Sequence, residues 1–485
     1  METISMRIGS EWRSGDSQFG SLDPYLGSSW AMVAEATKQD VDDAVAAARA
    51  AFDGGPWRTM SGSERGRLMH RLADEIENAA DDLALAETKD NGKLLREMGG
   101  QIRALPGWYR YFAGLADKID GRVVDTGRAD FFGFVTREPV GVVAAIVPWN
   151  SPLLLLTWKL APALAAGCTM VVKPSEHAPV SVMKFAELFE RAGISPGVFN
   201  TLGGAREPGE WLVSHPDVDH VTFTGSEGTG AAVARAAGTN HTPVTLELGG
   251  KSANIVFPDA DLEAASNGLI AGIFAAAGQT CIAGSRALIH EDVYDEVITR
   301  VVARAKRIVM GDPSAVDTEM GPICFPGQHE KIGRMVNEAV ASGGELVVGG
   351  GDGGLGGLFY EATIVGNVTN DSMICREEVF GPVLSALKFS TDAEAIAIAN
   401  DSRYGLAAGV WTKDVQRALR MSRALRVGTV WVNAYRTVNA TMPFGGVKHS
   451  GHGRENGVEA LSSFLVDKAV WMELTGNTRD PFVLG

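Results

Sequence analysis

Residues 141–147 read GVVAAIV, residues 153–166 read LLLLTWKLAPALAA, and residues 169–172 read TMVV. The first and third runs are short, apolar and rich in β-branched residues, as expected of buried strands, whereas the middle run has the length of a helix. Strands of a parallel sheet are covered on both faces and therefore read as near-continuous apolar runs. This stretch predicts strand, crossing helix and parallel strand, the repeating unit of an α/β fold.

The alternation continues toward the C-terminus in two series. The first has a helix at Val182–Ala192 and strands at Val198–Leu202, Val221–Thr224 and Val244–Leu248. The second begins near Ala253, runs to about Val432, and has helical patterns at Val293–Val309 and Lys331–Val340 and strands at Val383–Leu387 and Thr429–Val432. Because Gly249-Gly250 interrupts two apolar runs, we expect a boundary near Leu248–Lys251 and two α/β lobes.

Three other segments do not follow this alternation. The first hundred residues have a mainly helical pattern after a short strand and turn region. Asp120–Thr136 is rich in β-branched and aromatic residues and broken by Gly121 and Gly127, which predicts a strand pair or an extended arm. Nine glycines between Gly343 and Gly357 predict a loop, to which we assign no role.

Composition excludes several classes of protein. The chain has 485 residues, 45% of them hydrophobic, which is enough for a large core, and a net charge of −15, which argues against nucleic acid or anionic membrane as a partner. Four cysteines without a CxxC pair, and nine histidines without HExxH, predict neither a disulfide framework nor a metal site. Met1–Arg13 has no apolar signal region, and the apolar stretch Pro152–Met170 contains Lys159, so we expect a cytoplasmic protein without a membrane span.

Two glycine-containing segments are candidates for chemistry. Gly225–Gly230 follows a strand and precedes a helical stretch, so its backbone N–H groups could bind an anion such as pyrophosphate, although a plain glycine turn has the same pattern. Cys281 follows Gly278-Gln-Thr and could be a nucleophile, although a lone cysteine is more often an inert buried residue.

Two polar residues at strand ends are also candidates. Glu247 lies at the end of an apolar strand, where a carboxylate is costly unless it is functional or paired with a Lys or Arg. Asn150 lies at the carboxyl end of a strand, where α/β sheets place ligand sites, although such a residue is usually a helix N-cap.

Seven short motifs occur in a specific order along the chain. They are Pro148-Trp149-Asn150, Val172–Glu176, Phe223–Ser226, Leu246–Lys251, Gly278–Cys281, Glu377–Pro382 and Pro443–Gly446. In this order, from about residue 7 to residue 470, the sequence resembles the NAD(P)-dependent aldehyde dehydrogenase superfamily. The resemblance implies oxidation of an aldehyde to a carboxylic acid through a covalent thioester.

The resemblance also implies roles for the candidate catalytic residues. Cys281 matches the nucleophile that forms a thiohemiacetal and then a thioester, and Asn150 matches the amide that binds the oxyanion. Glu247 matches the general base that activates water to hydrolyse the thioester. Because the branch of the superfamily that transfers the acyl group to CoA commonly lacks this base, Glu247 argues against a CoA-acylating semialdehyde dehydrogenase. The presence of both Cys281 and Glu247 argues against a non-catalytic NAD-binding structural member of the fold.

Cofactor residues follow from the same resemblance. Lys173 and Glu176 match the pair that contacts the adenosine ribose, and a carboxylate there favours NAD over NADP because it repels a 2′-phosphate. Glu378 matches the residue that holds the nicotinamide ribose. The other positions that match the cofactor site are Trp149, Gly225, Ser226, Leu248 and Phe380.

The resemblance implies two doubly wound α/β lobes with a small β-strand oligomerisation arm. We expect an NAD-binding domain at 1–116 and 137–248, a catalytic domain at 249–462, and an arm at 117–136 and 463–485. Since a small strand arm is marginal alone in water, we expect a homodimer or homotetramer.

Substrate residues are the least constrained. The positions that match the family's substrate tunnel are Leu155, Trp158, Ile282, Thr437 and Val438, preceded by Tyr435 and Arg436. Tyr435 and Arg436 could bind an anionic or polar substrate tail, but Arg436 fits a solvated loop residue or an interface ion pair as well. The tunnel fits a medium aliphatic or aromatic aldehyde and a semialdehyde equally.

Overall fold

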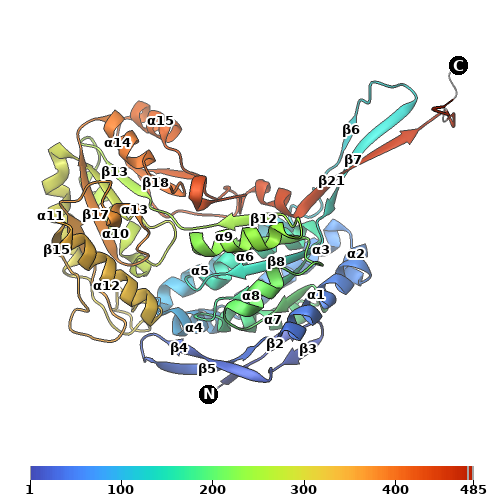
Figure 1. Cartoon of the computed structure of the whole chain (residues 1–485), viewed down its shortest axis with the longest axis horizontal. Helices are drawn as coiled ribbons and strands as arrows, with labels where there is room; N and C mark the ends of the chain where they lie inside the picture. The colour runs from blue at the N-terminus through green and yellow to red at the C-terminus, as the bar shows by residue number, and fades with distance from the viewer. Residues whose placement is uncertain (1, 478–479, 483–485) are drawn as a thin grey trace.

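The first lobe is built around a six-stranded sheet. The computed structural model describes residues 2–477 and 480–482 (Figure 1). The strand order is β10 (Phe199–Thr201), β9 (Thr169–Pro174), β8 (Val142–Val147), β11 (His220–Thr224), β12 (Val244–Glu247) and β20 (Gly451–His452). The first five strands are parallel, and β20 pairs antiparallel with β12.

Both faces of this sheet are covered, which explains the continuous apolar runs. Val143 and Ala145 of β8 lie in one core cluster, and Val142 and Ala144 lie in another on the opposite face. Helices that contribute to the first cluster are α3 (Gly62–Asn78), α4 (Ala80–Asn91), α5 (Leu95–Ala113) and α6 (Pro152–Ala166). Helices that contribute to the second are α1 (Lys38–Asp53), α8 (Arg206–Val213) and α9 (Glu227–Gly238), and α7 (Val180–Arg191) contributes to both. The short helix α2 (Pro56–Thr59) buries Trp57 in the first cluster.

The second lobe has its own seven-stranded sheet. The strand order is β15 (Glu345–Val348), β16 (Thr363–Gly366), β17 (Val383–Phe389), β14 (Arg286–His290), β13 (Ala253–Val256), β18 (Ala407–Trp411) and β19 (Thr429–Val432). All neighbours are parallel except β15 and β16. The helices are α10 (Leu262–Ile273), α11 (Tyr294–Ala305), α12 (Pro326–Ala341), α13 (Met373–Arg376), α14 (Asp392–Asn400) and α15 (Val415–Ala424).

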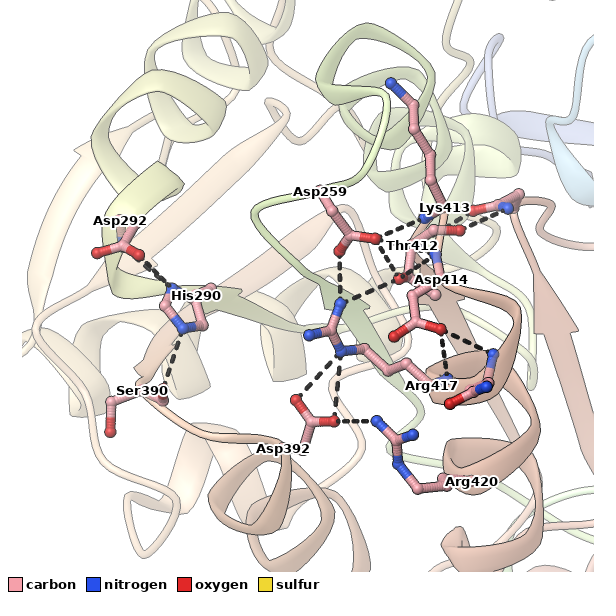
Figure 2. A network of polar contacts seen from close by, with 12 residues as sticks. Asp259, His290, Asp292, Ser390, Asp392, Thr412, Lys413, Asp414, Arg417 and Arg420 are labelled. Atoms are coloured by element: carbon pink, nitrogen blue, oxygen red, sulfur yellow. Dashed lines mark hydrogen bonds and ion pairs between the residues drawn. The ribbon is translucent and has the colours of Figure 1, made fainter.

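An ion-pair network fixes the helices α14 and α15 to this sheet (Figure 2). Arg417 of α15 lies between Asp259, at 2.7 Å, and Asp392 of α14, at 3.2 Å. Asp259 also accepts backbone N–H groups of Lys413 and Asp414, in the turn that follows β18. The half-buried Asp259 carboxylate therefore holds the start of α15 against the loop after β13.

A narrow β arm projects from the body, as the sequence predicted (Figure 1). It has the strand order β21 (Leu465–Glu473), β7 (Phe131–Pro139) and β6 (Arg122–Val124), all antiparallel. A second small sheet near the N-terminus has the order β1 (Glu2–Ile4), β5 (Ser28–Glu35) and β4 (Ser17–Asp23), next to the hairpin β2 (Met6–Ile8) and β3 (Glu11–Arg13). A few residues of the expected domain ranges lie outside the described residues. They are residue 1 of the range 1–116, and residues 478–479 and 483–485 of the range 463–485.

Two sequence expectations need correction. The glycine-rich segment 343–357 is not all loop, because Glu345–Val348 forms the edge strand β15. The range 249–462 does not stay in the second lobe, because β20 extends the first sheet, and Ala460 and Leu461 of the 3₁₀ segment Val458–Phe464 pack in the core of the first lobe. Within the described ranges, no helix is both long and apolar enough to cross a membrane, and no cluster of three potential metal ligands occurs.

Candidate active site between the two lobes

The candidate catalytic residues converge from both lobes. Asn150 follows β8, Glu247 ends β12, and Cys281 lies in the loop between α10 and β14. The Asn150 side chain donates to the carbonyl oxygen of Gln279 at 3.2 Å, two residues before Cys281. The predicted N-cap role falls to Ser151, which precedes α6. Asn150 is therefore free of helix capping and lies beside the loop of the candidate nucleophile.

The loop that carries Cys281 is conformationally strained. Ala276 and Ala277 have φ values of 55° and 50°, in a left-handed region that costs a residue with a Cβ roughly 1–2 kcal/mol, and Gly278 follows at 67°. A side chain on Gly278 would lie 2.0 Å from the carbonyl oxygen of Gly381, so only glycine fits there. Such strain is held by the surrounding structure and is common at active sites.

The surroundings of the Cys281 thiol favour its protonated form. Burial, followed by the charges of Glu378 and Glu247, raises the pKa of Cys281 to about 12, although the backbone N–H groups of Ile282 and Cys281 itself act to lower it. Formation of the thiolate therefore needs a proton acceptor nearby. The backbone N–H groups beside the sulfur are suitably placed to bind an oxyanion.

Glu247 is a buried carboxyl group without a partner. Its side chain makes no ion pair or hydrogen bond with any described residue, which removes the salt-bridge alternative for the described part of the chain. Burial raises its pKa well above the usual value, the Glu455 charge raises it further, and Lys159 and Arg454 lower it. A Cβ on Gly445 would lie 2.6 Å from the Glu247 carboxylate, so this glycine provides the space that Glu247 occupies. A raised pKa is what a general base near neutral pH requires.

Sequence reasoning missed the ion pair behind Glu247. Lys159 of α6 is fully buried and pairs with Glu455, which is also buried, and the Lys159 ammonium donates to Thr224 at 2.6 Å. The signal was present, since Lys159 is a charged residue inside the most apolar stretch of the chain. Its partner could not be found from the sequence, because Glu455 is 296 residues away.

The residues expected at the nicotinamide end lie together. Gly250 donates its backbone N–H to Glu378 at 2.9 Å, and a Cβ on Gly249 would lie 2.3 Å from the same carboxylate. Burial raises the pKa of Glu378 to about 6. The ring of Trp149 lies edge-on to Phe380, with centroids 5.1 Å apart.

The residues expected at the adenosine end lie along the edge of the first sheet. Lys173 is the second-to-last residue of β9, and its ammonium is 3.8 Å from the partly exposed Glu176 carboxylate. Ser226 caps the N-terminus of α9, and its hydroxyl accepts the Thr229 N–H at 3.3 Å. A Cβ on Gly225 would lie 2.5 Å from the Phe223 ring, and Leu248 packs against Gly230 of the same turn. A side chain at Gly225 or Gly230 would therefore clash, and the Gly225 N–H itself donates to the Glu247 carbonyl oxygen at 3.0 Å, so an anion at this turn would meet the N–H groups at the start of α9.

The expected substrate residues are only partly brought together. Leu155, Trp158 and Ile282 share one core cluster, and Val438 and Cys281 pack against it. Thr437 is exposed, and its carbonyl oxygen accepts the indole N–H of Trp431.

Tyr435 and Arg436 differ from each other. The Tyr435 ring packs against Gly272 and Gly284 of the second lobe and also borders the core clusters of both lobes. Arg436 is half-buried, donates to the carbonyl oxygen of Ala271 at 3.0 Å, and forms no ion pair with a described residue. It is therefore not a freely solvated loop residue.

Comparisons with known proteins agree with this geometry. Residues 12–470 match the model of the aldehyde dehydrogenase family. A hydroxybutyrolactone dehydrogenase of Acinetobacter baylyi, named (Z)-2-((N-methylformamido)methylene)-5-hydroxybutyrolactone dehydrogenase, is 45% identical over 100% of both chains. Aldehyde dehydrogenase 1A1 of Gallus gallus is 45% identical over 96% of this chain and 93% of its own.

Solved structures show the same fold. Betaine aldehyde dehydrogenase from Staphylococcus aureus in complex with NAD+ has a TM-score of 0.97 and 39% identity, and covers 100% of this chain and 97% of its own. The NAD+ complex of aldehyde dehydrogenase from Bacillus cereus has a TM-score of 0.96 and 41% identity, over 98% and 97% of the two chains. Both of these structures are oxidoreductases, and the chain shares their fold. The chain belongs to the aldehyde dehydrogenase family, which confirms the predicted resemblance and fold class.

Proposed function

We propose that this protein oxidises an aldehyde to the carboxylic acid with NAD, through a thioester on Cys281 that water hydrolyses. The observation that carries the proposal is a buried Glu247, without a partner among the described residues, whose charge acts on Cys281, with Asn150 in contact with the loop that carries Cys281. The charge of Glu247 raises the pKa of Cys281, so the two groups interact, and the Glu247 carboxylate is the group that takes the proton when Cys281 loses it. The Cys281 thiolate then attacks the aldehyde carbon.

Asn150 and Glu247 act after this attack. The Asn150 amide and the backbone N–H of Cys281 donate to the oxyanion of the thiohemiacetal, and one such donor is typically worth about 10²–10³ in rate. When bound, NAD accepts the hydride that leaves the thiohemiacetal carbon. Glu247, once it has passed the proton from Cys281 to solvent, removes a proton from the water that attacks the thioester, which releases the acid and frees Cys281.

The residues expected at the cofactor site fit NAD. Gly249 leaves space for Glu378, and the turn at Gly225 presents backbone N–H groups at the start of α9. Glu176 supports NAD over NADP, because its carboxylate repels a 2′-phosphate. The NAD+ complexes among the similar structures agree with this choice. We assign NAD binding to residues 1–116 and 137–248, together with the returning segment 451–464, and Cys281 to the second lobe.

Turnover tests the proposal directly. NADH formation is measured at 340 nm across short aliphatic, long aliphatic, aromatic and carboxylate-bearing aldehydes. We expect Cys281→Ala to abolish turnover while NAD still binds, and Glu247→Gln to give one burst of NADH and then stop at the thioester. Absence of turnover with every aldehyde and either cofactor would refute the proposal. A strict requirement for CoA would favour the acylating reaction, and NAD binding without turnover would favour a structural member.

We also propose that the chain is a homo-oligomer that associates through the arm. Apolar side chains on the arm are exposed, with Trp471 62% exposed and Val123 72% exposed. The last strand of the second sheet, β19, is an edge strand that can pair with another chain. Light scattering measures the mass, and Trp471→Glu should lower it to that of the monomer.

A further inference from the structure

An acidic residue lies at the helix end that we assign to the pyrophosphate. Glu227 is the first residue of α9 and directly follows Ser226, which caps the helix. A carboxylate at a helix N-terminus stabilises the helix, but it also repels any other anion that binds there. The Glu227 side chain is only partly exposed, so it does not simply extend into water. Its position therefore needs a physical reason.

The Glu227 carboxylate binds residues of the second lobe. One oxygen accepts the Tyr404 hydroxyl at 3.0 Å and lies 3.1 Å from the Arg403 guanidinium. Both of these residues precede β18, a strand of the second sheet. The His449 ring lies 2.7 Å from the other oxygen. Although burial acts to raise it, the pKa of Glu227 is below its usual value, because these three neighbours favour the charged carboxylate.

Arg403 extends this contact to the neighbour of a second cofactor residue. Its guanidinium donates to the Glu377 carboxylate at 2.6 Å. Glu377 directly precedes Glu378, to which we assign the nicotinamide ribose. Glu227, Arg403 and Glu377 therefore form a chain of charges between the two lobes. One end of the chain is next to Ser226, and the other end is next to Glu378.

The segment around Ser450 joins the same two lobes beside this chain. The His449 N–H donates to the Arg403 carbonyl oxygen at 3.0 Å. The buried Ser450 hydroxyl accepts the Gly405 N–H at 2.9 Å and donates to the Gly249 carbonyl oxygen at 2.7 Å. Gly249 follows β12 of the first lobe, and Gly405 precedes β18 of the second. Buried backbone contacts thus fix the lobes at this point, and the chain of charges fixes the start of α9 relative to them.

We propose that Glu227, Arg403 and Glu377 form a clasp that sets the distance between the pyrophosphate turn and the nicotinamide-ribose end of the cofactor site, and so increases the affinity for NAD. This inference rests on the cofactor site proposed above. Glu227 and Arg403 are positioning residues, because they act through Ser226 and Glu378. NAD reaches both ends of the clasp, whereas ADP reaches only the end in the first lobe.

Removal of Glu227 separates this role from simple electrostatics. Loss of a negative charge beside the pyrophosphate would by itself strengthen NAD binding, whereas loss of the clasp weakens it. We expect Glu227→Ala to raise the Kd for NAD about 2- to 10-fold, since partly exposed ion pairs contribute modest free energies. The Kd for ADP should not rise. Calorimetry measures both Kd values and needs no turnover.

Further variants complete the test. Arg403→Gln should raise the Kd for NAD in the same range, and it carries the test if Glu227→Ala does not fold. The double variant Glu227→Ala/Arg403→Gln should lose less than the two single variants together, because each single change already breaks the same chain. Glu263→Ala removes an exposed carboxylate from the first turn of α10 and is the matched control, with an unchanged Kd.

Two results would overturn the inference. One is a Kd for NAD that is unchanged or lower in Glu227→Ala, which would leave Glu227 as an ordinary surface ion pair. The other is an equal rise in the Kd values for NAD and ADP, which would indicate damage to the start of α9 alone. If the parent binds NAD but oxidises no aldehyde, the proposed oxidation fails, and the ratio of the Kd values of Glu227→Ala and the parent still decides the inference.

Discussion

Removal of Lys159 is expected to destabilise the first lobe strongly. Lys159→Met keeps an unbranched side chain in α6 but leaves Glu455 buried without its cation. Exposed ion pairs contribute about 0–1 kcal/mol, whereas loss of one partner of a buried pair costs about 3–5 kcal/mol. The side chains of Lys159 and Glu455 are 0% and 4% exposed, so the larger figure applies to the free energy of unfolding.

Urea denaturation of the single and double variants measures this cost. The double variant Lys159→Met/Glu455→Gln should lose less than the sum of the singles, because no charge is then left buried. Arg206→Met, which removes an exposed pair with Glu210, is the control and should stay within about 0.5 kcal/mol of the parent. A loss below about 1 kcal/mol in Lys159→Met would refute the reasoning.

Lys159 and Glu455 should shift the pKa of the proposed general base, Glu247, in opposite directions. Glu455 raises the pKa of Glu247 and Lys159 lowers it, after the larger effect of burial. Glu455→Gln should therefore move the acid limb of the kcat–pH profile to lower pH, and Lys159→Met should move it to higher pH. Movement of both profiles in the same direction would indicate structural damage in place of electrostatic control.

Three further changes have defined outcomes. Burial raises the pKa of Glu87 to about 7, above its unfolded value of about 4.3, so the native state retains a proton that the unfolded state loses, and stability falls as pH rises between these values. In thermal melts, the free energy of unfolding of Glu87→Gln should therefore rise by roughly 3 kcal/mol relative to that of the parent between pH 4.5 and pH 8. A difference in stability between the two proteins that does not change with pH would contradict this. Gly249→Ala places a Cβ 2.3 Å from Glu378 and should raise KM for NAD at least tenfold (roughly 1.4 kcal/mol), while the melting temperature shows whether the fold persists. Gly445→Ala, at φ 153°, places a Cβ 2.6 Å from Glu247, so stopped-flow traces should show a normal NADH burst and a slower steady state.

The layered fold could be predicted because burial on both faces has a direct sequence signature. Runs such as Gly141–Val147 are apolar at every position since alternate residues enter different cores. The strand β20 could not be predicted, because two residues carry no period and its pairing with β12 depends on a chain that returns from the other lobe. Edge strand β15 was hidden by flanking glycines that predict a loop.

Some residues of the candidate site could also be predicted from the sequence, and others could not. Glu247 gave a signal because a carboxylate in an apolar strand is costly. Glu455 gave none, since its burial depends on Lys159 at the far end of the chain. The left-handed Ala276 and Ala277 were also invisible, because alanine does not favour that conformation and only the packed loop imposes it.

The closing strand of the arm also imposes an order on biosynthesis. Lys468 of β21 pairs with Glu138 of β7, a partner 330 residues earlier in the chain. At roughly 5–20 residues per second, translation of that interval takes about 15–65 s, during which the first hairpin is on the ribosome without its third strand. The nascent chain therefore exposes an unsatisfied strand edge for most of its synthesis, and we expect chaperone dependence to be greatest in this window.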